Sequence, residues 1–168
     1  RSGYTLSLTN TFDPRKTKFF PKFPWPRIVN PKITFPLNEE NLAKVQELEK
    51  EALQEIRLEI DEGGEDIAAL IIEPIQGEGG DNHFRKEFLL ALRAICDENE
   101  IMLIFDEIQT GVGLTGRFWA YEHFDVKPDI LCFGKKTQVC GILVSRRVDE
   151  VGCNVFSERS RINSTFGG

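Results

Sequence analysis

The stretch Ile101-Met-Leu-Ile-Phe-Asp106 is a run of five apolar residues that ends in a carboxylate. An apolar run of this length without alternation is typical of a strand buried on both faces, as in a parallel sheet. A second run, Leu131-Cys-Phe-Gly134, is followed at once by Lys135. The sequence therefore predicts two buried strands, one ending in an acid and the other in an amine.

The segments around these strands alternate between helical and strand patterns. Asn38 is a candidate helix cap, apolar residues recur at helical spacing as far as Ile60, and Gly63-Gly64 stops the pattern. Further patterns predict a strand over 67–72, a helix whose apolar face runs from Phe88 to Cys96, and strands over 130–133 and 142–144. This order predicts an α/β fold, a largely parallel sheet flanked by helices, with functional groups at the carboxyl ends of the strands.

Residues 1–37 differ from the core expected over 38–168. They hold six of the eight prolines, including Pro21, Pro24 and Pro26, so helices are not expected there. The segment also carries many aromatic residues. We interpret it as an irregular arm whose aromatic side chains pack against a subunit surface.

Composition excludes several classes of partner. The net charge is −6 and acidic and basic residues are interspersed, so neither nucleic acid nor an anionic membrane is expected as a partner. No apolar run is long enough to span a bilayer, and no signal segment is present in this sequence. The four cysteines lack metal-ligand spacing, which favours free thiols in a reducing cytoplasm and no metal site.

The amine and the carboxylate suggest a specific chemistry. A pyridoxal phosphate enzyme needs one group to hold the aldehyde as a Schiff base and another to keep the pyridine nitrogen protonated. Lys135 and Asp106 are candidates for these roles, and Glu73 follows a third predicted strand. By itself the pair is weak, because an Asp at a strand end often caps a turn and a Lys usually lies in water.

Ordered motifs strengthen this interpretation. The chain contains Glu73-Pro-Ile-Gln-Gly-Glu-Gly-Gly80, Leu103-Ile-Phe-Asp-Glu-Ile-Gln-Thr-Gly111 with Thr115-Gly116, and Pro128-Asp-Ile130 leading to Lys135. In that order they resemble the core of the class III, pyridoxal-phosphate-dependent aminotransferases. The stretch Phe133-Gly-Lys-Lys-Thr-Gln-Val-Cys-Gly141 is similar to the lysine 6-aminotransferase subgroup. The resemblance extends over nearly the whole chain, including Phe20-Pro-Lys-Phe-Pro-Trp-Pro26 and Asn163-Ser-Thr-Phe-Gly-Gly168.

The resemblance implies the large, cofactor-binding domain of a fold-type I pyridoxal-phosphate-dependent transferase. Such enzymes are more than twice as long as this chain. We therefore expect residues 1–168 to be an internal fragment of that domain, with the small domain outside it.

The resemblance also implies roles around the cofactor ring. Lys135 would hold the aldehyde and move the proton; the adjacent Lys136 competes, but the preceding small residue Gly134 favours Lys135. Asp106 would pair with the pyridine nitrogen. Gln109 would bond to the phenolic oxygen, and Ile108 would pack on one face of the ring.

Three further positions match residues outside the ring site. Glu78 matches a glutamate that neutralises an active-site arginine and so permits dual specificity; a solvated loop glutamate is the alternative. Thr165 matches a threonine that reaches the cofactor phosphate of the neighbouring subunit, which implies a homodimer. Arg1 is a candidate ligand for the substrate carboxylate.

The resemblance implies a transaminase that moves the ε-amino group of L-lysine to 2-oxoglutarate through pyridoxal 5'-phosphate, giving an aldehyde and L-glutamate. The segment after Lys135 departs from most class III enzymes, which have a glycine-rich stretch there, and this favours the lysine subgroup. A 4-aminobutyrate or ornithine aminotransferase remains an alternative. A non-catalytic module derived from such an enzyme is a third, although it would not need both Lys135 and Asp106.

Overall fold

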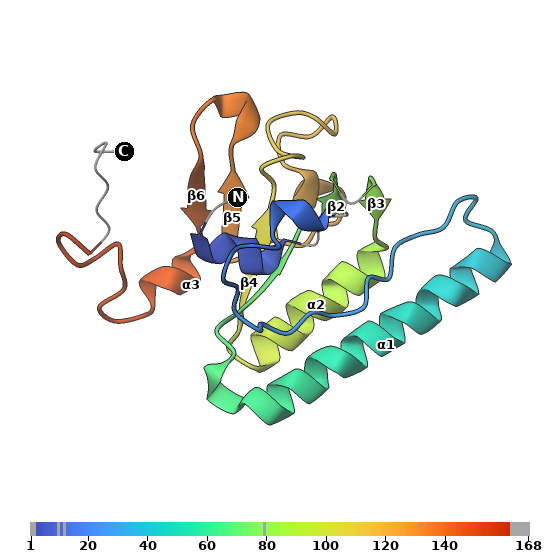
Figure 1. Cartoon of the computed structure of the whole chain (residues 1–168), viewed down its shortest axis with the longest axis horizontal. Coiled ribbons are helices and arrows are strands. Elements are labelled where there is room, and N and C mark those ends of the chain that lie inside the picture. The colour runs from blue at the N-terminus through green and yellow to red at the C-terminus, as the bar shows by residue number, and fades with distance from the viewer. Residues whose placement is uncertain (1–2, 10, 12, 79, 162–168) are drawn as a thin grey trace.

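A four-stranded sheet forms the centre of the computed structural model, which describes residues 3–9, 11, 13–78 and 80–161 (Figure 1). The strand order is β1-β4-β5-β6. β1 and β4 are parallel, β4 and β5 are parallel, and β5 and β6 are antiparallel. The bounds are β1 Ala69–Ile72, β4 Met102–Asp106, β5 Ile130–Phe133 and β6 Gly141–Val144. The expected α/β architecture with a mostly parallel sheet is confirmed, and β6 is its one antiparallel strand.

Two long helices, α1 (Glu39–Gly63) and α2 (Lys86–Glu98), provide the helical layer. Asn38 caps α1 as expected, because its side chain accepts a hydrogen bond of 2.9 Å from the backbone N–H of Asn41. Gly64, with φ 54°, ends the helix in the left-handed region. Apolar residues of both helices meet β4 in one buried cluster. Its members include Ala52, Ile56, Phe88, Leu89, Leu92, Ile95, Leu103 and Phe105.

The two faces of the sheet differ in burial. Leu103 and Phe105 of β4 are fully buried against the helices. Because side chains alternate along a strand, Ile104 and Asp106 lie on the opposite face. Ile71 is the parallel neighbour of Ile104 and is 38% exposed, so this second face is only partly covered. Asp106 thus ends β4 on the more accessible face.

A buried ion-pair network holds the amino ends of β4 and β5. Asp129, directly before β5, accepts hydrogen bonds of 2.8 Å from Arg93 Nη1 and from the backbone N–H of Leu103. Arg147 Nη1, on the short helix α3 (Arg146–Asp149), lies 3.4 Å from the same carboxylate. The network therefore joins α2, β4 and α3 through one side chain that is 8% exposed.

Short elements lie around this core. Each is two to six residues long: the 3₁₀ helices η1 (Gly3–Leu8), η2 (Pro14–Lys16), η3 (Gly64–Asp66), η4 (Ala120–His123) and η5 (Lys135–Thr137), and the paired strands β2 (Ile75–Gln76) and β3 (Asn82–His83). The prediction of no helix in the arm was wrong in detail, because η1 and η2 are 3₁₀ helices. Asp13 caps η2 at Arg15 N and Pro14 begins it, so proline here starts a helical turn instead of preventing one.

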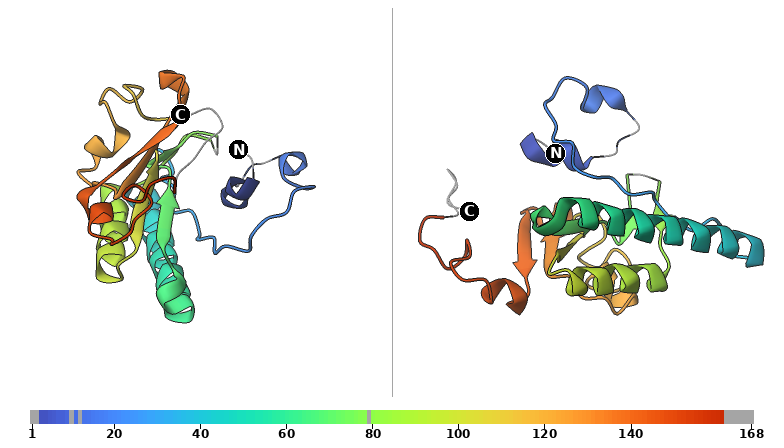
Figure 2. Two further views of the ribbon diagram at one scale, coloured as in Figure 1. Left: turned by 90° about the vertical axis from the view of Figure 1, so that its left-hand side faces the viewer. Right: turned by 90° about the horizontal axis from the view of Figure 1, so that it is seen from below.

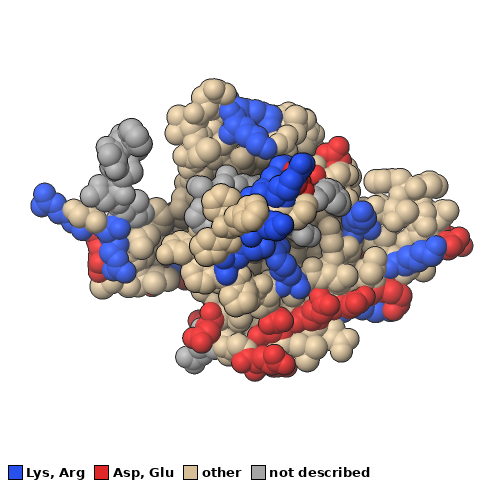
Figure 3. All heavy atoms as spheres, in the orientation of Figure 1, with Lys and Arg blue, Asp and Glu red and all other residues tan. Residues whose placement is uncertain are grey.

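The arm stands out to one side of the α/β core in both views of Figure 2. Basic side chains gather over the arm, whereas acidic side chains follow α1 (Figure 3). Within the described part of the chain, no helix combines the length and the apolar character needed to cross a membrane.

Candidate active site

Asp106 and Lys135 reach the same edge of the sheet because they follow adjacent parallel strands. Asp106 ends β4 and is paired in register with Cys132 of β5, three residues before Lys135. Burial raises the pKa of the Cys132 thiol, and the neighbouring charge of Asp106 raises it further, which agrees with the two side chains sharing a face. The predicted meeting of these segments at the carboxyl ends of the strands is therefore observed.

The turn after Asp106 carries Ile108 and Gln109. Asp106 Oδ1 accepts a hydrogen bond of 3.1 Å from the backbone N–H of Ile108. The backbone of Glu107 donates to Cys132 O over 2.9 Å and accepts from the N–H of Gly111 over 2.9 Å. The turn is thus bonded both to β5 and to itself, and it holds Ile108 and Gln109, which are half-buried, next to Asp106.

Lys135 has an uncommon backbone conformation. Its φ of 48° lies in the left-handed region, which a residue with a long side chain seldom adopts. Lys135 Nζ donates a hydrogen bond to Gln109 Oε1, and its side chain is exposed. Lys135 is one of eight described non-glycine residues with a positive φ, so its contact with Gln109, and not this conformation, connects it to the site.

Lys136 also reaches the turn, although by a different contact. Its Nζ donates to the backbone oxygen of Gln109 over 2.5 Å. Among the described residues, the Lys135 amine bonds to the side chain of Gln109, whereas the Lys136 amine bonds to its main-chain oxygen. This difference favours Lys135 over Lys136.

Gly134 is small because its surroundings leave no room for a side chain. A Cβ at this position would lie 2.8 Å from Cys140 Sγ and 3.6 Å from Ile108 Cγ2. The approach places Ile108 beside the backbone that leads into Lys135. The amine, the carboxylate and an apolar side chain therefore converge.

The loop after Glu73 packs against Gln109. Glu73 Oε2 accepts a hydrogen bond of 3.1 Å from the backbone N–H of Gly77. A Cβ on Gly77 would lie 2.7 Å from Gln109 Cγ, so glycine permits this close approach. Glu73, the acid that follows β1, thus shapes the loop that carries Glu78 towards the site.

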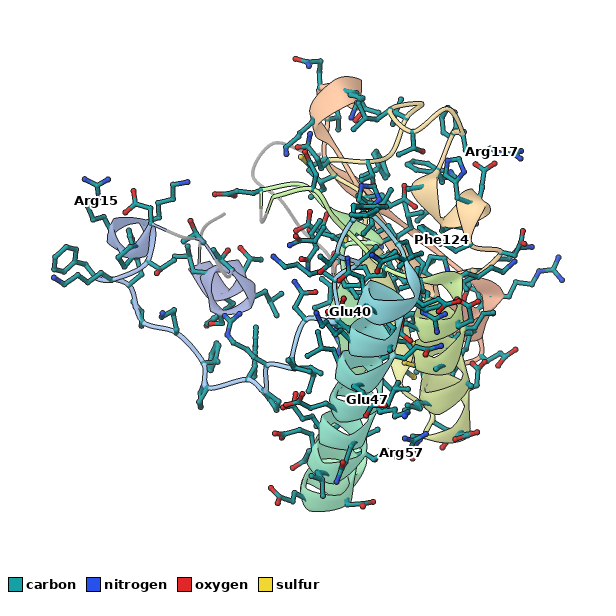
Figure 4. All side chains as sticks on the ribbon, turned by 90° about the vertical axis from the view of Figure 1, so that its right-hand side faces the viewer. Arg15, Glu40, Glu47, Arg57, Arg117 and Phe124 are labelled. Carbon is teal, nitrogen blue, oxygen red and sulfur yellow. The ribbon has the colours of Figure 1, made fainter. Side chains whose placement is uncertain are left out.

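Glu78 is paired with the arm. Its Oε1 lies 2.9 Å from Lys16 Nζ and 3.4 Å from Thr11 Oγ1. Among the described residues, Lys16 is a cation that pairs with this carboxylate, and the arginine partner that the resemblance implies stays a prediction. Figure 4 shows that η2, which carries Arg15 and Lys16, lies well apart from α1 and its labelled Glu40 and Glu47. The loop of Glu78 therefore links the arm to the core.

Two expected site residues, Arg1 and Thr165, lie outside the described residues. Within the described part of the chain, no group of three or more His, Cys, Asp or Glu residues could hold a metal ion.

The arrangement fits pyridoxal 5'-phosphate by the chemistry of its groups. An amine that can hold an aldehyde, a carboxylate that can pair with a ring N–H, and an amide that can bond to a phenolic oxygen lie on adjoining segments. Ile108 supplies an apolar surface beside them. Residues Lys135, Asp106, Gln109 and Ile108 would hold the ring.

Sequence reasoning missed one polar residue of this region, Glu107. Its side chain is 1% exposed and accepts hydrogen bonds from the backbone N–H groups of Ala120 and Tyr121, over 2.6 Å and 2.9 Å. A signal was present in the sequence. Alternate residues of a strand share one face, so Glu107 is expected on the same buried face as Leu103 and Phe105. An acid at a buried position needs internal hydrogen-bond donors.

Comparison with known proteins agrees with this geometry. A sequence model of the family described as Aminotransferase class-III matches residues 1–168. The chain belongs to the class III aminotransferases. The expected transaminase fold is also confirmed: the solved structure of a lysine aminotransferase from M. tuberculosis matches all of this chain and 38% of its own, with a TM-score of 0.93 and 58% identity.

Relatives within this class differ in their substrates. The L-lysine-epsilon aminotransferase of Mycobacterium tuberculosis (strain ATCC 25618 / H37Rv) is 58% identical over all 168 residues, which cover 36% of that protein. The 4-aminobutyrate aminotransferase of Emericella nidulans is 45% identical over 123 residues, covering 72% of this chain and 24% of that protein. The chain thus spans little more than a third of the length of the first relative, and its matched part about a quarter of the second.

Proposed function

We propose that the protein containing this chain is an L-lysine 6-transaminase. It would transfer the ε-amino group of L-lysine to 2-oxoglutarate through pyridoxal 5'-phosphate, giving an aldehyde and L-glutamate. The observation that carries the proposal is the convergence of Lys135, Asp106 and Gln109 at the carboxyl ends of β4 and β5. The higher identity to lysine than to 4-aminobutyrate aminotransferases supports the choice of amine.

Each residue has a defined task in this proposal. When bound, the cofactor supplies an aldehyde that accepts the amine and a ring that withdraws electrons. Lys135 would hold the aldehyde carbon until the substrate amine displaces it, and its freed amine would then move the proton from the substrate carbon that bears the nitrogen to the cofactor carbon. Asp106 keeps the proton on the ring nitrogen. Gln109, which already orders the Lys135 amine, bonds to the phenolic oxygen, and Ile108 packs on the ring face.

Substrate recognition involves Glu78 and Arg1. Arg1 would bind the substrate carboxylate, and Glu78 would cover a cation during the amine half-reaction and release it for the α-carboxylate of glutamate. The contact with Lys16 supports a carboxylate that exchanges cationic partners, since both side chains are about half exposed, at 58% for Lys16 and 42% for Glu78.

We further propose a cytoplasmic homodimer. Thr165 would reach the cofactor phosphate of the neighbouring subunit. The exposed rings of Tyr4, Phe23 and Trp25, with centroids 5.0 and 5.1 Å apart, offer an apolar surface for that subunit. The four cysteines are free thiols, which supports a reducing compartment.

The amine donor is tested by the absorbance of the cofactor in the full-length protein. Single-turnover mixing with L-lysine, 4-aminobutyrate or L-ornithine measures the rate at which each amine discharges the cofactor band. We expect L-lysine to react fastest. A faster reaction with 4-aminobutyrate or ornithine would assign the protein to another ω-aminotransferase, and absence of a cofactor band would favour a non-catalytic module.

The role of Glu78 is tested by the same method applied to each half-reaction. Glu78→Ala should slow the lysine half-reaction about tenfold more than the glutamate half-reaction, because the exposed cation then favours the α-carboxylate. Lys16→Ala is the control, since it removes the observed partner and keeps the carboxylate. Equal slowing of both half-reactions by Glu78→Ala would show a general structural role.

A further inference from the structure

The side chain of Glu107 lies between the turn that carries Ile108 and Gln109 and the amino end of η4. Its Oε2 accepts a hydrogen bond of 2.6 Å from the backbone N–H of Ala120, and its Oε1 accepts one of 2.9 Å from the backbone N–H of Tyr121. Thr110 Oγ1 donates to Oε2 over 3.4 Å. One carboxylate therefore accepts hydrogen bonds from the first two backbone N–H groups of η4 and from a hydroxyl group of its own turn.

The backbone of Glu107 is fixed as firmly as its side chain. Its N–H donates to Cys132 O of β5, and its carbonyl accepts from Gly111 N, each over 2.9 Å. The residue thus connects β5, η4 and both ends of the turn 107–111. Ile108 and Gln109 lie between the two ends of this turn, and Asp106 directly precedes Glu107.

Burial and hydrogen bonding shift the pKa of this carboxylate in opposite directions. Burial raises the pKa of Glu107, whereas the hydrogen bonds from Ala120, Tyr121 and Thr110 lower it, and the charge of Glu122 raises it. A carboxylate that is 1% exposed is stable inside the protein only when it accepts hydrogen bonds from such donors. The positions of the Glu107 side chain and of η4 therefore depend on one another.

Neighbouring packing leaves the turn little room to shift. A Cβ on Gly111 would lie 2.7 Å from the Trp119 ring, and Val112 N donates to Phe118 O over 2.7 Å. The end of the turn therefore packs closely against Phe118 and Trp119, which directly precede the η4 residues that Glu107 binds.

We propose that Glu107 is a positioning residue for the cofactor. This proposal rests on the function proposed above. It acts through the turn: by binding η4 it sets where Asp106, Ile108 and Gln109 meet the ring. A displacement of about 1 Å in such groups can cost on the order of a hundredfold in rate, so loss of this anchor should reach the cofactor without any direct contact.

A matched control is present at the same helix. Glu122 Oε1 accepts 2.7 Å from Trp119 N, so it also caps the start of η4, but it has no bond to the turn 107–111 among the described residues. If Glu107 is merely a helix cap, variants of the two glutamates should behave alike. If it positions the turn, only Glu107 variants should change the binding of the cofactor.

The experiment uses the full-length protein stripped of cofactor, with Glu107→Gln, Glu107→Ala and Glu122→Ala. Equilibrium dialysis measures the Kd for pyridoxal 5'-phosphate, and thermal unfolding of the apoprotein measures stability. We expect Glu107→Ala to raise the Kd about 10- to 100-fold. Glu107→Gln should give a smaller increase, because it retains one acceptor, and Glu122→Ala should stay within about twofold. The midpoint temperature of thermal unfolding should be lower for both alanine variants than for the wild type.

The outcomes separate the two proposals. An unchanged Kd in Glu107→Gln and Glu107→Ala, with stability lowered as in Glu122→Ala, would overturn the positioning role alone. If Glu107→Ala does not fold, Glu107→Gln decides: a Kd within twofold of wild type overturns the role, and a clear increase supports it. Failure of the wild-type protein to bind pyridoxal 5'-phosphate would overturn both the proposed function and this inference.

Discussion

The two ends of β4 and β5 each carry an aspartate, and the two aspartates have opposite surroundings. At the amino ends, Asp129 is nearly buried and is bonded to Arg93, Arg147 and the N–H of Leu103. At the carboxyl ends, Asp106 is half-buried and accepts one bond from the turn at Ile108 N. A carboxylate whose bonding capacity is used inside the protein stabilises the fold, whereas one that keeps capacity at an accessible edge can bind a ligand.

The strongest test of this comparison is Asp106→Ala in the full-length protein. We expect turnover to fall by about three orders of magnitude or more, because the ring nitrogen loses the carboxylate that keeps it protonated. The free energy of unfolding should change by no more than about 1 kcal/mol, since only the turn bond to Ile108 N is lost. Steady-state kinetics and urea unfolding provide the two measurements. Near-normal turnover would remove Asp106 from the site.

The reverse pattern is expected for Asp129→Ala. Removal of this carboxylate leaves the Leu103 N–H without its acceptor and leaves Arg93 and Arg147 with the more exposed Asp97 as their shared carboxylate, so the free energy of unfolding should fall by about 3 kcal/mol. Turnover per folded molecule should stay close to that of the wild type. Glu47→Ala is the control, because Glu47 forms an exposed pair with Lys50 on α1 and should give no resolvable change in stability. A large loss of turnover with unchanged stability in Asp129→Ala would contradict the comparison.

A smaller effect distinguishes the cysteines at the two ends. Cys96 lies near the Asp129 network, and burial raises the pKa of its thiol to about 11. Cys140 is exposed and lies against Gly134, next to Lys135. At pH 8 iodoacetamide should label Cys140 readily, whereas Cys96, with roughly a thousandth of its thiol ionised, should react only after unfolding in urea. Peptide mapping of the labelled protein checks this, and early labelling of native Cys96 would show that the network end is open.

Much of the fold follows from local patterns. The apolar runs that become β4 and β5, the Asn38 cap and the stop at Gly64 are each decided by neighbouring residues. The antiparallel direction of β6 could also have been predicted from the sequence. Only residues 134–140 join it to β5, whereas a parallel connection needs a dozen or more residues. The β2–β3 pair was not, since strands of two residues leave no periodic pattern.

The site was predictable where it depends on the ends of strands. Asp106 and Lys135 were predicted there from local patterns, and Ile108 and Gln109 through the family resemblance; the structure brings their segments together, and their roles stay predictions. The contact of Glu78 with Lys16 was not predicted because the two residues are 62 positions apart and meet only through the fold of the arm. Glu107 was missed for a related reason: its donors, Ala120 and Tyr121, come from a helix with no distinct pattern.

The central claim, that the carboxyl end of β5 holds the cofactor through Lys135, is tested most directly by borohydride reduction of the full-length protein with pyridoxal 5'-phosphate. Reduction fixes the aldehyde to its amine, and mass spectrometry of the peptides identifies the residue. The account predicts one modified lysine, Lys135, which disappears in Lys135→Ala and persists in Lys136→Ala. Modification of Lys136 instead, or of no lysine in this chain, would contradict it.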